Sequence, residues 1–133
     1  MNTSKILKIY LFISGLILTA IGSLTIFNPI NIKANEGIEI AENASALNDV
    51  RSFGMLLLAT ALLSFLGSFK SPFRKSAAIS TFLLFLSLGL GRLLSIFLDG
   101  MPSDGMVKAT GLEIILGMLG LILFISNSKK QSF

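Results

Sequence analysis

The chain has 133 residues, of which 53% are hydrophobic and only 14% are charged, and its mean hydropathy is +0.82. A soluble domain carries about 25% charged residues, so these values exclude an ordinary soluble domain and predict extensive contact with lipid. The sequence contains no cysteine and no histidine, which excludes disulfides and removes the commonest metal ligand and the usual neutral-pH base. The net charge of +4 comes from basic residues that flank apolar segments, which indicates a membrane-topology signal and no nucleic-acid partner.

Four apolar segments predict four membrane-spanning helices in a single domain that covers residues 1–133. A spanning helix needs about 20 predominantly apolar residues. The predicted spans are residues 6–27, 47–69, 76–98 and 109–126. Short connections join antiparallel neighbours in helical bundles. We therefore predict an all-α membrane protein, an antiparallel four-helix transmembrane bundle with a polar outer loop.

The polar outer loop lies between the first two spans. Asn28-Pro29 is expected to end the first span, because proline lacks the backbone donor and restrains the residue before it. In residues 30–44, isoleucines alternate with polar residues on both sides of Gly37, a period that predicts a small β-hairpin. A lone hairpin is only marginally stable in water, so an irregular loop is an equally good interpretation.

Lysine and arginine are distributed unequally between the two sides of a four-span chain. On one side lie the N-terminus, the connection between the second and third spans and the C-terminal tail. Together these carry Lys5, Lys8, Lys70, Arg74, Lys75, Lys129 and Lys130. The flanks on the other side have Lys33 and Lys108 among six acidic residues. The positive-inside rule therefore predicts a multi-pass protein with both termini in the cytoplasm.

Three of the predicted spans bring a charged residue to similar depth near the outer side: Arg51 in the second, Arg92 in the third and Glu113 in the fourth. Arg92, Ser95 and Asp99 are spaced i, i+3 and i+7, so they share one face of a helix. An arginine costs about 2.5–3.5 kcal/mol at the centre of the bilayer and less near its edge. Pairing Arg92 with Glu113 or Asp99 would offset that cost. We therefore predict a cluster of Arg51, Arg92, Ser95, Asp99 and Glu113, which either binds a ligand, only locks the helices as buried ion pairs, or forms a proton or ion path.

No catalytic site, metal site or cofactor is predicted. A serine nucleophile needs a base, but the sequence has no histidine, and a serine–lysine pair would need a lysine within the membrane, where none is expected. Asp99, Asp104 and Glu113 are the acids that could hold a hard cation, but the neighbouring Arg51 and Arg92 oppose one. The protein is therefore predicted not to be an enzyme.

Three motifs mark the outer ends of the later spans. They are Leu47-Asn48-Asp49-Val50-Arg51-Ser52-Phe53-Gly54, Gly91-Arg92-x-x-Ser95-x-x-x-Asp99-Gly100-x-Pro102, and Glu113. Over nearly the whole chain, these motifs resemble a family of small bacterial four-helix membrane proteins that is catalogued only as a domain of unknown function. The resemblance implies a bacterial inner-membrane protein, supplies no activity, and suggests that the charged residues of the motifs belong to one element. The general layout is also similar to DoxX-type four-helix membrane proteins, some of which are linked to quinone or sulfur redox partners.

Three functions remain open on this basis. The first is a non-enzymatic membrane module that binds a small anionic or amphiphilic ligand, such as a lipid or a quinone, at the outward polar site. It requires a cavity lined by Arg92 and Glu113, and a solid core there would argue against it. The second is a structural or accessory subunit that meets a membrane-protein partner or a second copy of the chain. The third is a small proton-coupled transporter that uses Glu113.

Overall fold

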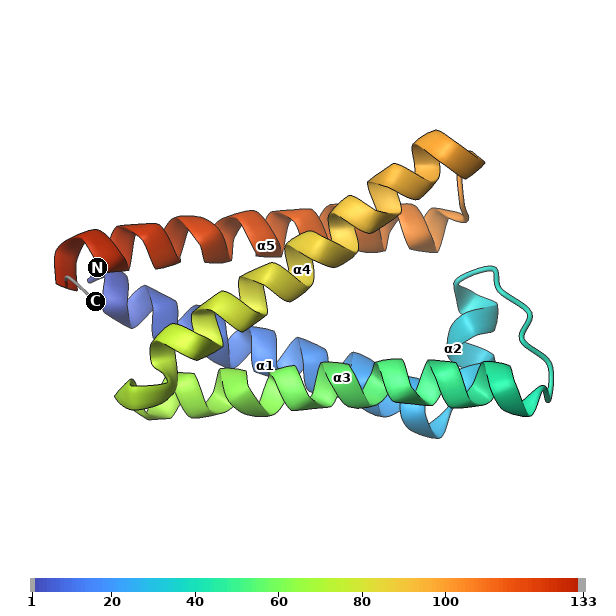
Figure 1. The fold of residues 1–133 in the computed structure, drawn as a ribbon, viewed down its shortest axis with the longest axis horizontal. Coiled ribbons are helices and arrows are strands. Elements are labelled where there is room, and N and C mark those ends of the chain that lie inside the picture. Colours follow the sequence, from blue (N-terminus) through green and yellow to red (C-terminus); the bar gives the residue numbers. More distant parts are fainter. Residues whose placement is uncertain (1, 132–133) are drawn as a thin grey trace.

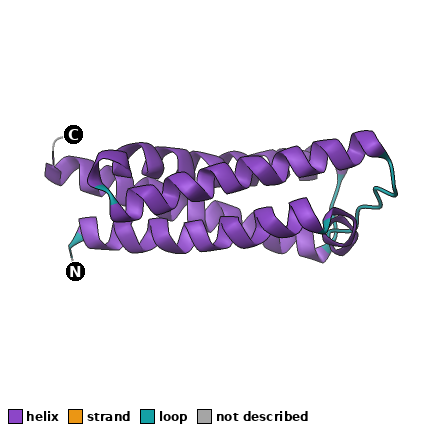
Figure 2. Cartoon of the chain, turned by 90° about the horizontal axis from the view of Figure 1, so that it is seen from below, coloured by secondary structure: helices purple, strands orange, loops and turns teal. Residues whose placement is uncertain are grey.

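The chain folds as a bundle of long helices in the computed structural model, which describes residues 2–131. The helices are α1 (Thr3–Phe27), α2 (Pro29–Asn35), α3 (Ala44–Phe69), α4 (Ser71–Asp99) and α5 (Asp104–Gln131). All except the short α2 are long and apolar enough to cross a membrane. No strand occurs in residues 2–131, and Figure 2 shows only helices and loops there. The predicted all-α membrane bundle is thus confirmed.

The long helices run antiparallel in two pairs. Figure 1 shows α1 beside α3 and α5 beside α4, with both ends of the chain at the same end of the bundle. We call this the terminal end and the opposite one, where α2 lies, the loop end. In the same view α4 crosses the bundle obliquely, from the last turn of α3 toward the first turn of α5. The two pairs therefore diverge toward the loop end.

Local signals explain where the helices begin and end. Asn43 caps α3, because its side-chain oxygen accepts from the backbone N–H groups of Ser45 and Ala46 at 2.9 and 3.1 Å. Only Lys70 separates α3 from α4, and a proline lies in the first turn of α4. Arg74 Nε donates to the carbonyl oxygen of Gly67 at 3.0 Å and so satisfies a free carbonyl at the end of α3.

The hairpin alternative for the outer loop is wrong, because residues 29–35 form the helix α2. Asn28 does end α1, as predicted, but Pro29 then opens a new helix, since its restricted φ suits a first turn. Gly37 ends α2 at φ +82°, where the N–H of Ile38 bonds the carbonyl of Lys33 at 2.8 Å. This is a Schellman motif. Local hydrogen bonds of this kind outweigh the isoleucine alternation.

The core is densest between the terminal end and the middle of the bundle. Its two clusters of buried residues are Leu7, Tyr10, Leu11, Ala77, Ala78 and Leu123, and Leu18, Leu57, Ala61 and Phe85. Between α3 and α4 the hydroxyls of Ser64 and Thr81 are hydrogen-bonded at 2.6 Å. Nearer the loop end, the described part of the chain contributes no large side chain to these clusters. Tight packing thus gives way to looser packing where the helix pairs diverge.

Tyr10 links α1 to α5 within the dense part. Its hydroxyl donates to the carbonyl oxygen of Leu116 at 2.8 Å. This approach depends on Gly120, because a Cβ there would overlap the Tyr10 hydroxyl.

We expect Tyr10→Phe to lower the free energy of unfolding by about 1 kcal/mol, the usual net worth of a hydrogen bond between membrane helices. Denaturant titration in detergent, followed by circular dichroism, measures this. An unchanged midpoint would contradict the bond between the hydroxyl and the carbonyl.

Candidate functional site

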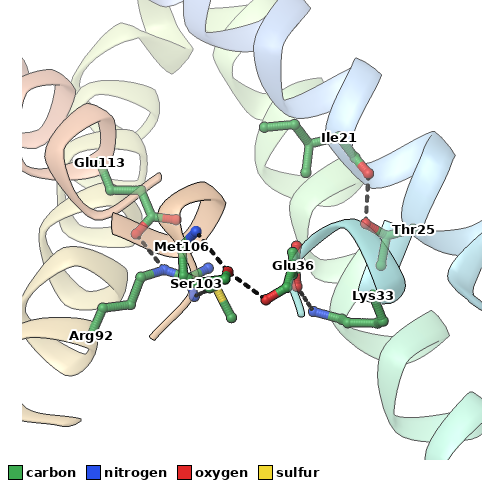
Figure 3. A network of polar contacts seen from close by, with 8 residues as sticks. All are labelled: Ile21, Thr25, Lys33, Glu36, Arg92, Ser103, Met106 and Glu113. Atoms are coloured by element: carbon green, nitrogen blue, oxygen red, sulfur yellow. Dashed lines mark hydrogen bonds and ion pairs between the residues drawn. The ribbon is translucent and has the colours of Figure 1, made fainter. Parts of the chain in front are cut away.

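An ion pair joins α4 to α5 near the loop end. Arg92 Nε donates to Glu113 Oε2 at 2.8 Å, and the two side chains are 24% and 13% exposed (Figure 3). Arg92 Nη1 also contacts the sulfur of Met106 at 3.0 Å. Of the two acids considered from the sequence, Glu113 is therefore the one that neutralises Arg92. In a membrane, such pairing offsets the cost of both charges.

The other three predicted site residues have different partners. Ser95 Oγ donates to Asp99 Oδ2 at 2.9 Å on the exposed surface of α4. Asp99 lies seven residues beyond Arg92, about 10 Å along the helix, and it does not pair with Arg92. Arg51 is exposed and donates through Nη1 to the carbonyl oxygen of Ile26, near the end of α1. The five predicted residues thus form three separate contacts, and only Arg92 and Glu113 come together as an ion pair.

A cavity of about 310 Å³ opens between the two helix pairs beside this ion pair. All five helices contribute to its wall, which consists mainly of aliphatic and aromatic side chains. Its polar members are Thr25, Asn35, Glu36, Arg92 and Glu113. The cavity lined by Arg92 and Glu113, which a binding function requires, is therefore present.

The cavity reaches the lipid-facing surface of the bundle between α1 and α5. Ile21 and Leu24 of α1 and Leu112 of α5 line it, yet each is exposed, by 41%, 49% and 46%. Because these three side chains line the cavity and are also exposed on the surface of the bundle, they form the rim of the cavity. An apolar molecule in the bilayer thus has a lateral route into the cavity.

A second, more polar groove of about 480 Å³ lies between α3 and α4. Its polar residues are Lys33, Asp49, Ser87, Arg92 and Ser95. Phe53, Leu88 and Arg92 line both the groove and the cavity. Arg92 therefore lines both the mainly apolar cavity and the more polar groove.

Helix α2 connects the two helix pairs at the loop end. Ser103, just before α5, donates through its hydroxyl to the backbone carbonyl oxygen of Glu36 at 2.7 Å (Figure 3). Lys33 Nζ forms an ion pair with Glu36 at 2.7 Å and lies 5.8 Å from the centre of the Phe53 ring on α3. The helix thus bonds to the α4–α5 side and packs on the α3 side. Sequence reasoning missed Lys33, Glu36 and Ser103, because these contacts depend on the unpredicted α2.

Charges around the cavity balance each other. Arg92 is paired with Glu113, and Lys33 is paired with Glu36. An anion would therefore meet two carboxylates together with two cations, so the site has no net attraction for a negative group. An uncharged polar group fits this environment better.

The Arg92 guanidinium retains donors for a ligand. A guanidinium carries five N–H donors and no acceptor. Glu113 is its only oxygen partner within residues 2–131, and its other contact is to the weakly accepting sulfur of Met106. Because Arg92 also lines the cavity, its remaining donors are available to an oxygen atom of a ligand there.

Comparison with known protein families identifies the family of this chain. A family model described as "Domain of unknown function (DUF4345)" matches residues 6–124. No curated protein and no solved structure matches the chain significantly.

Proposed function

The chain belongs to the DUF4345 family, whose function is unknown, and from the geometry of the site we propose that it binds an uncharged amphiphile in the cavity. The observation that carries this proposal is Arg92, a guanidinium with free donors in the wall of an apolar chamber. The polar head of the amphiphile accepts from Arg92. Its apolar part lies against the aliphatic wall.

The size and position of the cavity support this kind of ligand. Ligand pockets in proteins are typically about 300–1,000 Å³, and the cavity, at about 310 Å³, is at the small end of that range. It therefore holds the head and the first part of a tail. The rest of the tail extends between α1 and α5 into the bilayer, past the exposed rim formed by Ile21, Leu24 and Leu112.

Membrane lipids with uncharged heads and quinones have the required chemistry, since both combine hydrogen-bond acceptors with an apolar tail. The balanced charges of the Arg92–Glu113 and Lys33–Glu36 pairs disfavour the anionic alternative. The role proposed is binding without catalysis, because the sequence has neither histidine nor cysteine to act as base or nucleophile.

The proposed location is the inner membrane of a bacterium, with both termini in the cytoplasm. The terminal end of the bundle carries seven lysines and arginines and no acidic residue, whereas all seven acidic residues lie toward the loop end. This asymmetry supports a cytoplasmic terminal end. The cavity then opens into the outer leaflet.

Native mass spectrometry of gently extracted protein tests the proposal. Ala109 lines the cavity, and we expect Ala109→Phe to reduce the retained amphiphile at least tenfold by occupying its space. Ala59→Phe is the matched control, because Ala59 is exposed on α3 and is absent from the cavity wall. The control should retain as much amphiphile as the native protein.

Arg92→Lys tests the hydrogen bond between Arg92 and the polar head of the amphiphile, whereas Ala109→Phe tests only whether the cavity has room for the ligand. Lysine keeps the charge opposite Glu113 but lacks the forked donors of arginine. We expect retention to fall about tenfold, the factor that corresponds to losing one charge-assisted hydrogen bond, while the melting temperature stays near the native value. Equal retention in Ala109→Phe and Ala59→Phe would overturn the proposal, as would native protein that carries no amphiphile and co-purifies with a larger complex.

A further inference from the structure

The terminal end has an open groove on its lipid-facing side, far from the cavity. It lies between the first turns of α1 and the last turn of α3 and has a volume of about 480 Å³. Its lining residues are Lys5, Lys8, Ile9, Phe12, Ser68 and Phe69. From this groove we infer a second binding site, which holds an anionic phospholipid of the adjoining leaflet.

Along α1 the groove is charged nearest the terminal end and apolar farther into the bundle. A phospholipid has the same order, with a charged headgroup followed by acyl chains. Lys5 and Lys8 are one turn apart on the same face of α1, and both are exposed. Ile9 lies four residues after Lys5, and Phe12 lies four residues after Lys8. Each apolar side chain is therefore about 6 Å farther along the helix than the lysine that precedes it. The two ammonium groups thus lie at the level of a phosphate, and the apolar floor lies at the level of the first acyl carbons.

Direct contacts hold the floor of the groove in place. The ring of Phe12 packs edge-to-face on Phe65 and Phe69, with ring centres 5.6 and 5.8 Å away. Ser68 Oγ donates to the carbonyl oxygen of Lys8 at 2.9 Å and ties α3 to α1 at this level. The groove is therefore a preformed surface between two packed helices and needs no rearrangement to accept an acyl chain.

Charge complementarity identifies the occupant as anionic. Within the described residues neither Lys5 nor Lys8 has an acidic partner, and the terminal end contains no acidic residue at all. Two unpaired ammonium groups above exposed aromatic surface attract an anionic headgroup, whereas a zwitterionic headgroup would bring a second positive charge toward them. This site does not depend on the amphiphile in the cavity.

Native mass spectrometry from nanodiscs that contain equal amounts of phosphatidylglycerol and phosphatidylcholine tests this site. We expect the native protein to retain phosphatidylglycerol preferentially. Lys5→Gln/Lys8→Gln should lower that retention between about five- and thirtyfold, because each basic residue near an anionic lipid surface contributes roughly fivefold. Lys5→Arg/Lys8→Arg should keep it.

Lys129→Gln/Lys130→Gln is the matched control. It removes the same charge from the same end of the bundle, but neither residue lines the groove. The control should retain phosphatidylglycerol within about twofold of the native protein. An equal loss in both double variants would show that only the overall charge matters and would overturn the site, as would equal retention of the two lipids by the native protein.

Discussion

Glu113→Leu is expected to lower the free energy of unfolding by about 2–3 kcal/mol, because it leaves Arg92 without its oxygen partner inside the bundle. Removing one member of a fully buried pair costs about 3–5 kcal/mol. The expected loss is smaller here, since the side chains of Arg92 and Glu113 are 24% and 13% exposed. Titration with sodium dodecyl sulfate in mixed micelles, followed by circular dichroism, measures the change.

Two further variants distinguish the loss of the Arg92–Glu113 ion pair from a general effect of removing a charged residue. Arg92→Met/Glu113→Leu removes both charges, so most of the lost stability should return. Asp99→Asn removes an exposed acid whose partner is Ser95, and its effect should stay within about 0.5 kcal/mol. A single Glu113→Leu variant as stable as the native protein would contradict a stabilising role of the ion pair.

Gly67→Ala is expected to destabilise the bundle by about 2–3 kcal/mol, the upper part of the usual range for overpacking. Gly67 is buried where α3 packs against the start of α4, and a Cβ there would overlap the Cβ of Ala77. Both atoms are attached directly to the backbone, so rotation of a side chain cannot relieve the overlap. The two helices must move apart, which also disturbs the bond from Arg74 to the Gly67 carbonyl.

The reciprocal change provides the control for this close approach. Gly67→Ala/Ala77→Gly moves the methyl group from one helix to the other and should recover more than half of the lost stability. Gly91→Ala places a Cβ where no atom lies within 4 Å. It should leave the bundle unchanged or stabilise it by up to about 1 kcal/mol, since glycine disfavours a helix interior. Thermal unfolding in one detergent compares the variants, and equal losses in Gly67→Ala and Gly91→Ala would contradict the explanation.

Some of the site follows from sequence alone. An arginine and a glutamate that enter neighbouring spans from the same side are expected to pair. Lipid offers no polar group to either charge, so pairing offsets the cost of placing both in the membrane. That argument correctly includes Glu113 among the candidate partners of Arg92. It fails for Arg51, which bonds the Ile26 carbonyl instead, because free carbonyls at a helix end do not show in a pattern of charged residues. It could not choose between Glu113 and Asp99 either, since that choice depends on how α5 lies against α4.

The lipid environment, the number of spans and the uneven distribution of charge can all be predicted from the amino-acid sequence. Each of these features follows from the length of an apolar run or from the residues that flank it. Run length and flanking residues are properties of one continuous segment of the chain. Two features arise from tertiary packing: α4 diverges from α3, and a cavity opens beside Arg92. Those features depend on how closely residues far apart in the chain approach one another. Gly67 against Ala77 brings α3 and α4 together at the terminal end. At the loop end, no glycine within residues 2–131 brings α3 and α4 comparably close, and the cavity lies in the space between the helix pairs.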